Sequence, residues 1–357
     1  MKIMFYISTI CNGGAARVMS NLANVLSERG HECTLITTFR APEEYQLAEG
    51  VKRVSFYDQK PIGAWFTKNV AITRMLRKQV KQEKPDLLVS FLAEPNFRAA
   101  MATIGIKTKT VLSVRNDPNW EYRGMLPTLL AKYLFRRADG VVFQTADAQA
   151  WFPKCIQQKS RIIFNAVKED FYDVELSEQP TGIVATGRLS RQKNHPMLVR
   201  AYSKIADKVT DDLTVYGAGD PIPLKALAEE LGVADRVHFP GQTMAVKDTI
   251  KSAKLYVMSS DFEGMPNALM EAMAMGLPCV STDCPCGGPK SLYTEDMKHY
   301  LTPVGDVDAM AARMLELIQN DDLRKAHAQH CKLAAKKFTP EIINQQWEEF
   351  LTGIIRR

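Results

Sequence analysis

The feature that most constrains the fold is an alternation in which short apolar runs are followed by helical patterns from one end of the chain to the other. This alternation is typical of parallel sheets with crossover helices. The expected strands are KIMFYIST, ECTLITT, DLLVSFL, TVLSV, GVVFQT and RIIFN in the first half, and GIVATG, DLTVYG, VHFPG, LYVMSS and PCVST in the second. The sequence therefore predicts an α/β protein with two doubly wound, Rossmann-like domains.

The length of 357 residues and the 46% of hydrophobic residues are sufficient for two domain cores. An acidic, poorly periodic stretch that ends in a proline interrupts the alternation, and we interpret residues 169–180 as a linker. The expected domains are residues 1–168 and 181–340. Because ligands gather beyond the carboxyl ends of parallel strands, we expect the two domains to face each other across a cleft that holds the site.

The charge is distributed unevenly along the chain. Residues 1–168 hold 25 basic and 13 acidic residues, a net charge of +12, whereas the remainder carries −6. Arg74, Arg77, Lys78 and Lys81 recur at helical spacing within residues 67–82, opposite an apolar face. One interpretation is a packed helix with a solvated face, and the other is attachment to an anionic membrane surface. No nucleic-acid partner is expected, because no recognition motif accompanies the charge.

Membrane spans and disulfides are not expected. No uncharged apolar run reaches the roughly 18 residues that a spanning helix needs. The apolar run at residues 3–10 is interrupted by Ser8 and Thr9, so we interpret it as a strand and not as a signal peptide. The seven cysteines are scattered and odd in number, which indicates free thiols and a cytoplasmic location.

The stretch FEGMPNALMEAMAMGLP places one glutamate on each side of a predicted helix start. Pro266 suits the first turn of a helix and Gly276 its end, so we expect a helix over residues 267–275. Glu263 then precedes the helix and Glu271 lies inside it. Carboxylates suit sugar hydroxyls and a helix N-terminus suits phosphate, which favours a sugar-nucleotide pocket. The alternative is a helix with a solvated Glu271 and a loop Glu263.

Three other motifs follow expected strands. STICNGGAARV provides Gly13 and Gly14 for a close turn, and TVYGAGDP provides Gly217 and Gly219. In ATGRLSRQKNHP, two cations emerge between a strand and a helix, where they can neutralise a diphosphate: Arg188 and Lys193. The G-x-G-x-x-G spacing is missing, which argues against a dehydrogenase.

Together, GGAAR, GRLSRQKN, TVYGAGDP and EGMPNALMEAMAMGLP with its Glu-x7-Glu spacing resemble the retaining glycosyltransferases of family four, which have the GT-B fold. The resemblance extends in order over essentially the whole chain. It implies a nucleotide-sugar donor and neither a metal ion nor another cofactor. The base of the donor is left open, with UDP favoured over GDP and ADP. It also implies that the last helix, residues 341–357, crosses back to the first domain.

The resemblance assigns roles to individual residues. Glu263 would contact the transferred sugar and Glu271 the ribose, while Arg188 and Lys193 would stabilise the leaving diphosphate. The predicted catalytic residues are Arg188, Lys193 and Glu263, the predicted donor-binding residues are Gly13, Gly14, Gly217, Gly264, Met265, Asn267, Ala268 and Glu271, and the predicted acceptor-side residues are Arg115 and Asn116.

The chain departs from the family pattern at two places. Ala16 stands where many members have a glutamate. Where many members have a histidine, this chain has Arg115, Asn116 and Asp117. The sequence therefore identifies no general base. In retaining members the leaving phosphate is thought to take the acceptor proton, so such a base is not required.

These observations favour transfer of a sugar to a lipid-linked glycan by an enzyme peripheral to the inner face of the cytoplasmic membrane. The basic first domain, the helix at residues 67–82 and the segment MLPTLLAKYLFRR at 125–137 would then face the lipid. The alternatives are a transferase with a soluble acceptor and a non-catalytic nucleotide-sugar scaffold.

Overall fold

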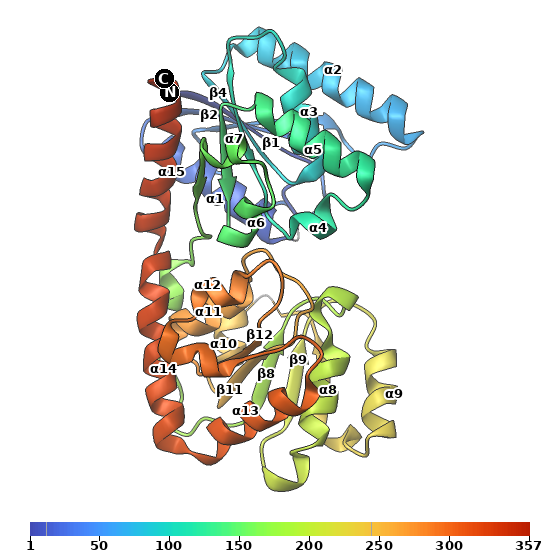
Figure 1. Cartoon of the computed structure of the whole chain (residues 1–357), viewed down its shortest axis with the longest axis vertical. Coiled ribbons are helices and arrows are strands. Elements are labelled where there is room, and N and C mark those ends of the chain that lie inside the picture. Colours follow the sequence, from blue (N-terminus) through green and yellow to red (C-terminus); the bar gives the residue numbers. More distant parts are fainter. Residues whose placement is uncertain (12, 244) are drawn as a thin grey trace. The chain divides into compact units, whose positions relative to one another are not determined.

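The computed structural model describes residues 1–11, 13–243 and 245–357. The chain divides into two compact units (Figure 1). The first unit comprises Met1–Ala166 with Glu341–Arg357, and the second comprises Val167–Pro340. The segment 169–180, predicted to be a linker, belongs to the second unit in this division.

The first unit is built on a parallel sheet with the strand order β3-β2-β1-β4-β5-β6-β7. Its strands are β1 (Lys2–Ile7), β2 (Glu32–Phe39), β3 (Val51–Tyr57), β4 (Leu87–Phe91), β5 (Lys109–Ser113), β6 (Gly140–Phe143) and β7 (Ser160–Ile162). In register, Phe5 of β1 lies opposite Leu35 of β2 and Val89 of β4. The order reverses between β1 and β4, which makes this pair the topological switch point of the sheet.

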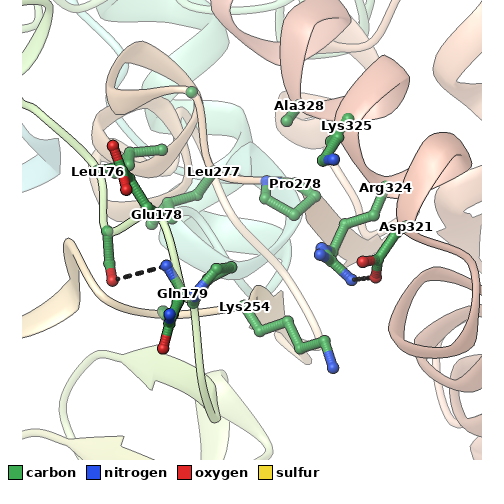
Figure 2. A pocket seen from close by; sticks show the side chains of 14 residues that line it. Leu176, Glu178, Gln179, Lys254, Leu277, Pro278, Asp321, Arg324, Lys325 and Ala328 are labelled. Carbon is green, nitrogen blue, oxygen red and sulfur yellow. Dashed lines mark hydrogen bonds and ion pairs between the residues drawn. The ribbon is translucent and has the colours of Figure 1, made fainter.

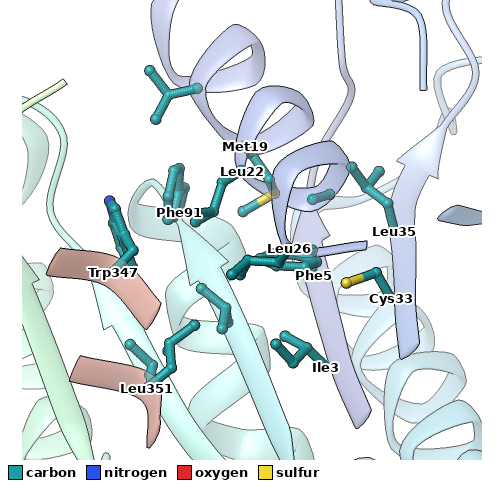
Figure 3. Close-up of a cluster of buried hydrophobic side chains, with 14 of the residues drawn as sticks. Ile3, Phe5, Met19, Leu22, Leu26, Cys33, Leu35, Phe91, Trp347 and Leu351 are labelled. Atoms are coloured by element: carbon teal, nitrogen blue, oxygen red, sulfur yellow. The ribbon is translucent and has the colours of Figure 1, made fainter. Parts of the chain in front are cut away.

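Helices cover both faces of this sheet. They are α1 (Gly14–Glu28), α2 (Trp65–Glu83), α3 (Ala93–Ala102), α4 (Pro118–Glu121), α5 (Met125–Arg137), α6 (Ala146–Ala150), α7 (Lys154–Gln157) and α15 (Pro340–Ile355). The core beneath α1 also takes in the last helix, because Trp347 of α15 is buried and packs on Phe91 at a ring distance of 5.6 Å. Figure 3 shows Trp347 and Leu351 among the side chains of this core. The predicted return of the last helix to the first domain is confirmed.

The second unit is built on a parallel sheet with the order β10-β9-β8-β11-β12-β13. Its strands are β8 (Ile183–Thr186), β9 (Leu213–Tyr216), β10 (Val237–Gly241), β11 (Leu255–Met258), β12 (Cys279–Thr282) and β13 (Leu301–Thr302). Its α-helices are α8 (His195–Ser203), α9 (Ile222–Glu230), α10 (Val246–Ile250), α11 (Asn267–Met275), α12 (Gly288–Leu292), α13 (Val307–Gln319) and α14 (Asp321–Ala335). Here the order reverses between β8 and β11.

Each predicted strand corresponds to an observed one, and α11 has the predicted bounds of 267–275. Two edge strands, β3 and β13, are absent from the sequence expectation. β3 carries Lys52 and Arg53 in place of an apolar run, and β13 contains two residues only. Among the described residues, no helix is both long and apolar enough to cross a bilayer. All seven cysteines are free thiols, as expected.

Candidate nucleotide-sugar site

The switch point of the second sheet brings together two residues that are 70 positions apart in the sequence. Lys193 follows β8 and Glu263 follows the neighbouring strand β11. The Lys193 Nζ lies 2.7 Å from Glu263 Oε1, and their side chains are only 16% and 9% exposed. The Ser260 hydroxyl donates to the same oxygen at 3.0 Å. This buried, charge-assisted pair lies where ligands bind in sheets of this topology.

The loop that carries Lys193 is fixed to the loop after β11 by further bonds. Asn194, at a left-handed φ of 43°, caps α8 by accepting from the Met197 amide and donates to Asp261 Oδ1 at 2.6 Å. The Ser259 hydroxyl donates to the Lys193 carbonyl at 2.9 Å. Lys193 is therefore held in place by contacts from the loops after both neighbouring strands, and such preorganisation favours a binding role.

The corner between β8 and α8 also contains a neutral histidine. His195 is buried, and its Nε2 lies 3.3 Å from the Gly187 carbonyl oxygen, which requires Nε2 to donate. Burial lowers the pKa of His195 to about 4, so the imidazole is uncharged at neutral pH. Arg188, the next residue after Gly187, is exposed. Positive charge at this corner therefore comes from Arg188, Arg191 and Lys193, while the uncharged His195 contacts the backbone between strand and helix.

Glycines allow the backbones around this corner to come into close contact. A Cβ on Gly217, just beyond β9, would lie 1.9 Å from the Gly187 carbonyl oxygen. A Cβ on Gly288 would lie equally close, 1.9 Å, to the carbonyl oxygen of Gly264. Neither position has room for a side chain, so backbone contact shapes both loops. The sequence alone singled out Gly217 and Gly264, but not Gly187 or Gly288 as their partners.

Helix α11 follows the second of these loops. Gly264 and Met265 are buried, Asn267 and Ala268 in the first turn are half-buried, and Glu271 is only 6% exposed. A short helix that carries a buried carboxylate and begins beside Glu263 offers backbone N–H groups and the positive end of its dipole to the same region. The alternative interpretation, in which Glu271 is solvated, is wrong because the Glu271 side chain is buried.

The first unit holds the remaining predicted residues. Gly13 precedes α1 in an extended conformation (φ −175°), and Gly14 begins the helix beyond β1. Asn12 of the same motif lies outside the described residues. Arg115 and Asn116 follow β5, and the Asn116 side chain accepts from the Asp117 amide at 2.9 Å.

Arg115 is a buried cation and not a surface one. Its guanidinium lies 4.4 Å from the centre of the Phe91 ring and donates to the side-chain oxygen of Asn165. Burial lowers the pKa of Arg115 to about 9. Its side chain packs inside the first unit, so its role toward an acceptor stays a prediction.

Two family models match the chain, one over each unit. The model described as Glycosyltransferase Family 4 matches residues 12–171, and the model described as Glycosyl transferases group 1 matches residues 180–320. The chain belongs to the family-four glycosyltransferases.

Curated relatives of this glycosyltransferase include two enzymes of Campylobacter jejuni. One is an alpha-1,4-N-acetyl-D-galactosaminyltransferase named for a diNAcBac-PP-undecaprenol glycan; it is 25% identical and covers 99% of each chain. The other, an N-acetylgalactosamine-N,N'-diacetylbacillosaminyl-diphospho-undecaprenol 4-alpha-N-acetylgalactosaminyltransferase, is also 25% identical and covers 99% of this chain and all of its own.

Solved structures identify the fold. HepE of Anabaena, crystallised in complex with UDP, superimposes with a TM-score of 0.83 at 18% identity and covers 99% of this chain and 100% of its own. The two parallel sheets and this similarity confirm the GT-B fold predicted for the glycosyltransferase.

One half-buried acid of the glycosyltransferase, Glu121, is not predicted from the sequence. Glu121, at the end of α4, accepts from the Ala93 amide at 2.7 Å and so caps the N-terminus of α3. Its other carboxylate oxygen is buried without a partner among the described residues. Burial raises the pKa of Glu121 to about 7. The contact joins residues 28 positions apart, and no local motif indicates it.

A cavity of about 550 Å³ lies in the second unit of the glycosyltransferase, away from the predicted residues. It is lined by residues 176–180, 253–254, 276–278, 321, 324–325 and 328. Figure 2 shows Lys254 and Pro278 in its wall, with Arg324 paired to Asp321. Because Lys254 and Pro278 directly precede β11 and β12, the cavity opens at the amino edge of the sheet. It is therefore separate from the switch-point site at the carboxyl edge.

Within the part of the chain that the structure describes, no group of three or more His, Cys, Asp or Glu side chains could hold a metal ion. Asp261 and Glu263 are close in sequence but have different partners: Asp261 accepts a hydrogen bond from Asn194, and Glu263 forms an ion pair with Lys193.

Proposed function

We propose that the chain is a retaining glycosyltransferase that moves a sugar from a UDP-sugar to a lipid-linked glycan at the inner face of the cytoplasmic membrane. The observation that carries the proposal is the Lys193–Glu263 pair of 2.7 Å at the switch point, next to the start of α11. It combines a cation for phosphate with a carboxylate for sugar hydroxyls in one buried corner.

Without a donor, Lys193 and Glu263 neutralise each other. A diphosphate offers Lys193 a second anionic partner, so the Glu263 carboxylate becomes available to accept from the hydroxyls of the transferred sugar. Arg188, exposed at the same corner, contributes the second positive charge. Both cations then stabilise the charge that grows on the leaving UDP.

In the transfer step, the bond between the sugar's anomeric carbon and the phosphate oxygen breaks. A bond from that carbon to the acceptor oxygen forms on the same face, and the leaving phosphate takes the acceptor proton. Lys193 and Arg188 provide the stabilisation that this step requires, and the proposal assigns it no metal ion. Glu271, buried in α11, accepts from the ribose hydroxyls.

The relatives and the charge distribution support the choice of donor and acceptor. HepE was crystallised with UDP and with UDP-glucose, and both Campylobacter relatives carry an undecaprenol glycan in their names. The excess of positive charge in residues 1–168 suits an acceptor and a membrane surface that are both anionic.

The test is thermal unfolding in the presence of UDP, GDP, ADP or NADH. We expect stabilisation by UDP that is lost in Arg188→Ala and in Glu271→Ala, because ligands stabilise the state that binds them. Arg200→Ala and Glu230→Ala, exposed residues of the same unit, are the controls and should retain the stabilisation. Stabilisation by NADH, or none by any nucleoside diphosphate, would contradict the proposal.

A further inference from the structure

The first unit exposes a group of large apolar side chains at the beginnings of two helices. Each is between 59% and 100% exposed, and the group comprises Ile62, Trp65 and Phe66 at the start of α2, and Met125, Leu126 and Leu129 at the start of α5. We call these six residues the apolar rim. Single exposed apolar residues are ordinary, but a group of this size on one surface indicates a binding function.

Topology places the two halves of the apolar rim at the same edge of the sheet. α3 packs against both α2 and α5, so the three helices form one layer. Figure 1 shows α2, α3 and α5 together on one side of the first unit. Helices that connect parallel strands run opposite to them, so each of these helices begins at the carboxyl edge. The Trp65 indole donates to Glu94 in the first turn of α3 at 3.4 Å, which ties two of the starts together.

Basic side chains accompany the apolar rim. Lys60 and Arg123 lie within a few residues of it in the sequence and are exposed. Along α2, Arg74, Lys78 and Lys81 are also exposed. Arg77 does not belong to this set, because it donates to the carbonyls of Ala102 and Ile104 at 2.8 and 2.7 Å and so caps the end of α3. The sequence-based prediction of four membrane-facing cations is thus reduced to three.

We infer that the apolar rim inserts into the interface of an anionic bilayer while the exposed cations of α2 contact lipid headgroups. A lipid surface suits this composition, because an indole, a phenyl ring and long aliphatic chains flanked by lysine and arginine match the transition from acyl chain to headgroup. Charge alone gives an attachment that salt abolishes, whereas insertion adds a component that salt does not screen.

The inference rests on the proposed function and specifies which edge of the first sheet faces the membrane. Arg115 and Asn116, the predicted acceptor-side residues, follow β5 at the same carboxyl edge as the apolar rim. An acceptor anchored in the bilayer by a lipid would therefore present its glycan to the edge of the sheet that the insertion brings to the membrane.

The experiment is flotation with vesicles of equal parts phosphatidylcholine and phosphatidylglycerol, at low and high salt. We expect wild type to bind at low salt and to retain measurable binding at high salt. Phe66→Ser/Leu126→Ser should bind about tenfold or more weakly at both salt concentrations, because the variant lacks two apolar side chains that wild type buries in the bilayer. The matched control is Ile222→Ser/Leu333→Ser, which removes two similarly exposed apolar residues of the second unit and should bind like wild type.

Depth of insertion has a separate readout. Lipids brominated on the acyl chain should quench part of the tryptophan fluorescence of wild type, and Trp65→Phe should lose that part while still binding. Three outcomes would overturn the inference: failure of wild type to bind, equal binding by Phe66→Ser/Leu126→Ser, or a dimer in solution that this variant disrupts.

UDP stabilisation of the same variants separates the two proposals. If UDP stabilises Phe66→Ser/Leu126→Ser as it does wild type, the lost vesicle binding comes from the apolar rim. If wild type binds vesicles but no nucleotide stabilises it, the proposed function fails and the membrane surface stands.

Discussion

At the scale of single residues, the central feature is the ion pair between Lys193 and Glu263. Lys193 and Glu263 are both largely buried, and Ser260 adds a hydrogen bond to the carboxylate. Loss of one charge would leave the other uncompensated in a largely buried position, so the pair contributes to stability even without a ligand. The sequence predicts both residues for the site but not their contact, which depends on β8 and β11 being neighbours in the sheet.

Removal of Lys193 should therefore destabilise the protein in the absence of any ligand. We expect Lys193→Met to lower the free energy of unfolding by about 2 kcal/mol, because it leaves a buried carboxylate unpaired. Glu263→Gln should cost less, since the amide oxygen still accepts from Ser260. The double variant should cost less than the sum of the single variants. Strictly additive values in denaturant titrations would show that the two side chains do not interact.

A second residue-scale prediction concerns Glu121, whose pKa is raised to about 7 by burial. The raised pKa means that the folded state holds a proton that the unfolded state loses near its ordinary value of 4.5. Stability from this group is therefore complete at low pH, and falls by about 2 to 3 kcal/mol as the pH rises to about 7.

Glu121→Gln removes the titration and keeps an acceptor for the Ala93 amide. Its free energy of unfolding should depend less on pH than that of wild type between pH 5 and about 7. Parallel profiles for the two proteins would contradict this account of Glu121.

At the scale of elements, the sequence predicts helices and strands whose ends are marked by nearby residues. It does not predict features that depend on contacts with distant parts of the chain. The bounds of α11 follow from Pro266 and Gly276, which are adjacent to the helix in the sequence and cap its two ends. Strand β3 has no apolar run, because an edge strand needs less burial and carries Lys52 and Arg53. The helix cap provided by Arg77 is likewise invisible in the sequence, where it reads as one more basic residue of α2.

Close backbone contact at the corner between β8 and α8 gives an element-scale prediction. Gly217→Ala should displace the turn after β8, because its Cβ would meet the Gly187 carbonyl oxygen at 1.9 Å. We expect about tenfold weaker UDP binding by calorimetry, a loss of about 1.4 kcal/mol. Gly353→Ala is the control, because nothing lies within 4 Å of its Cβ and alanine favours a helix interior. Equal UDP affinity for Gly217→Ala and wild type would show that this turn does not shape the site.

At the scale of the whole molecule, the chain closes the core of its first unit with its last helix. Trp347 and Leu351 of α15 are buried beside residues of β1 and β4 from the beginning of the chain. The spacing of apolar residues predicts a buried face on this helix, and the family resemblance predicts which unit it joins. Neither the spacing nor the resemblance identifies the side chains that this helix contacts, because Trp347 and Phe91 are far apart in the sequence.

Trp347→Ala should therefore destabilise the first unit selectively. We expect a loss of about 3 to 5 kcal/mol in that unit from the cavity left by the indole. Hydrogen exchange should become faster in β1 and β4 and remain unchanged in β8 and β11, which belong to the second unit. Equally faster exchange in both units would contradict an independent core for each.

The measurement that tests the central claim most directly is transfer from UDP-sugars to a polyisoprenyl-diphosphate-linked glycan, with the anomeric configuration of the product assigned by NMR. The account predicts release of UDP, a product with the configuration of the donor, and a rate at least about 100-fold lower for Glu263→Gln. An inverted product, or undiminished transfer by Glu263→Gln, would contradict it.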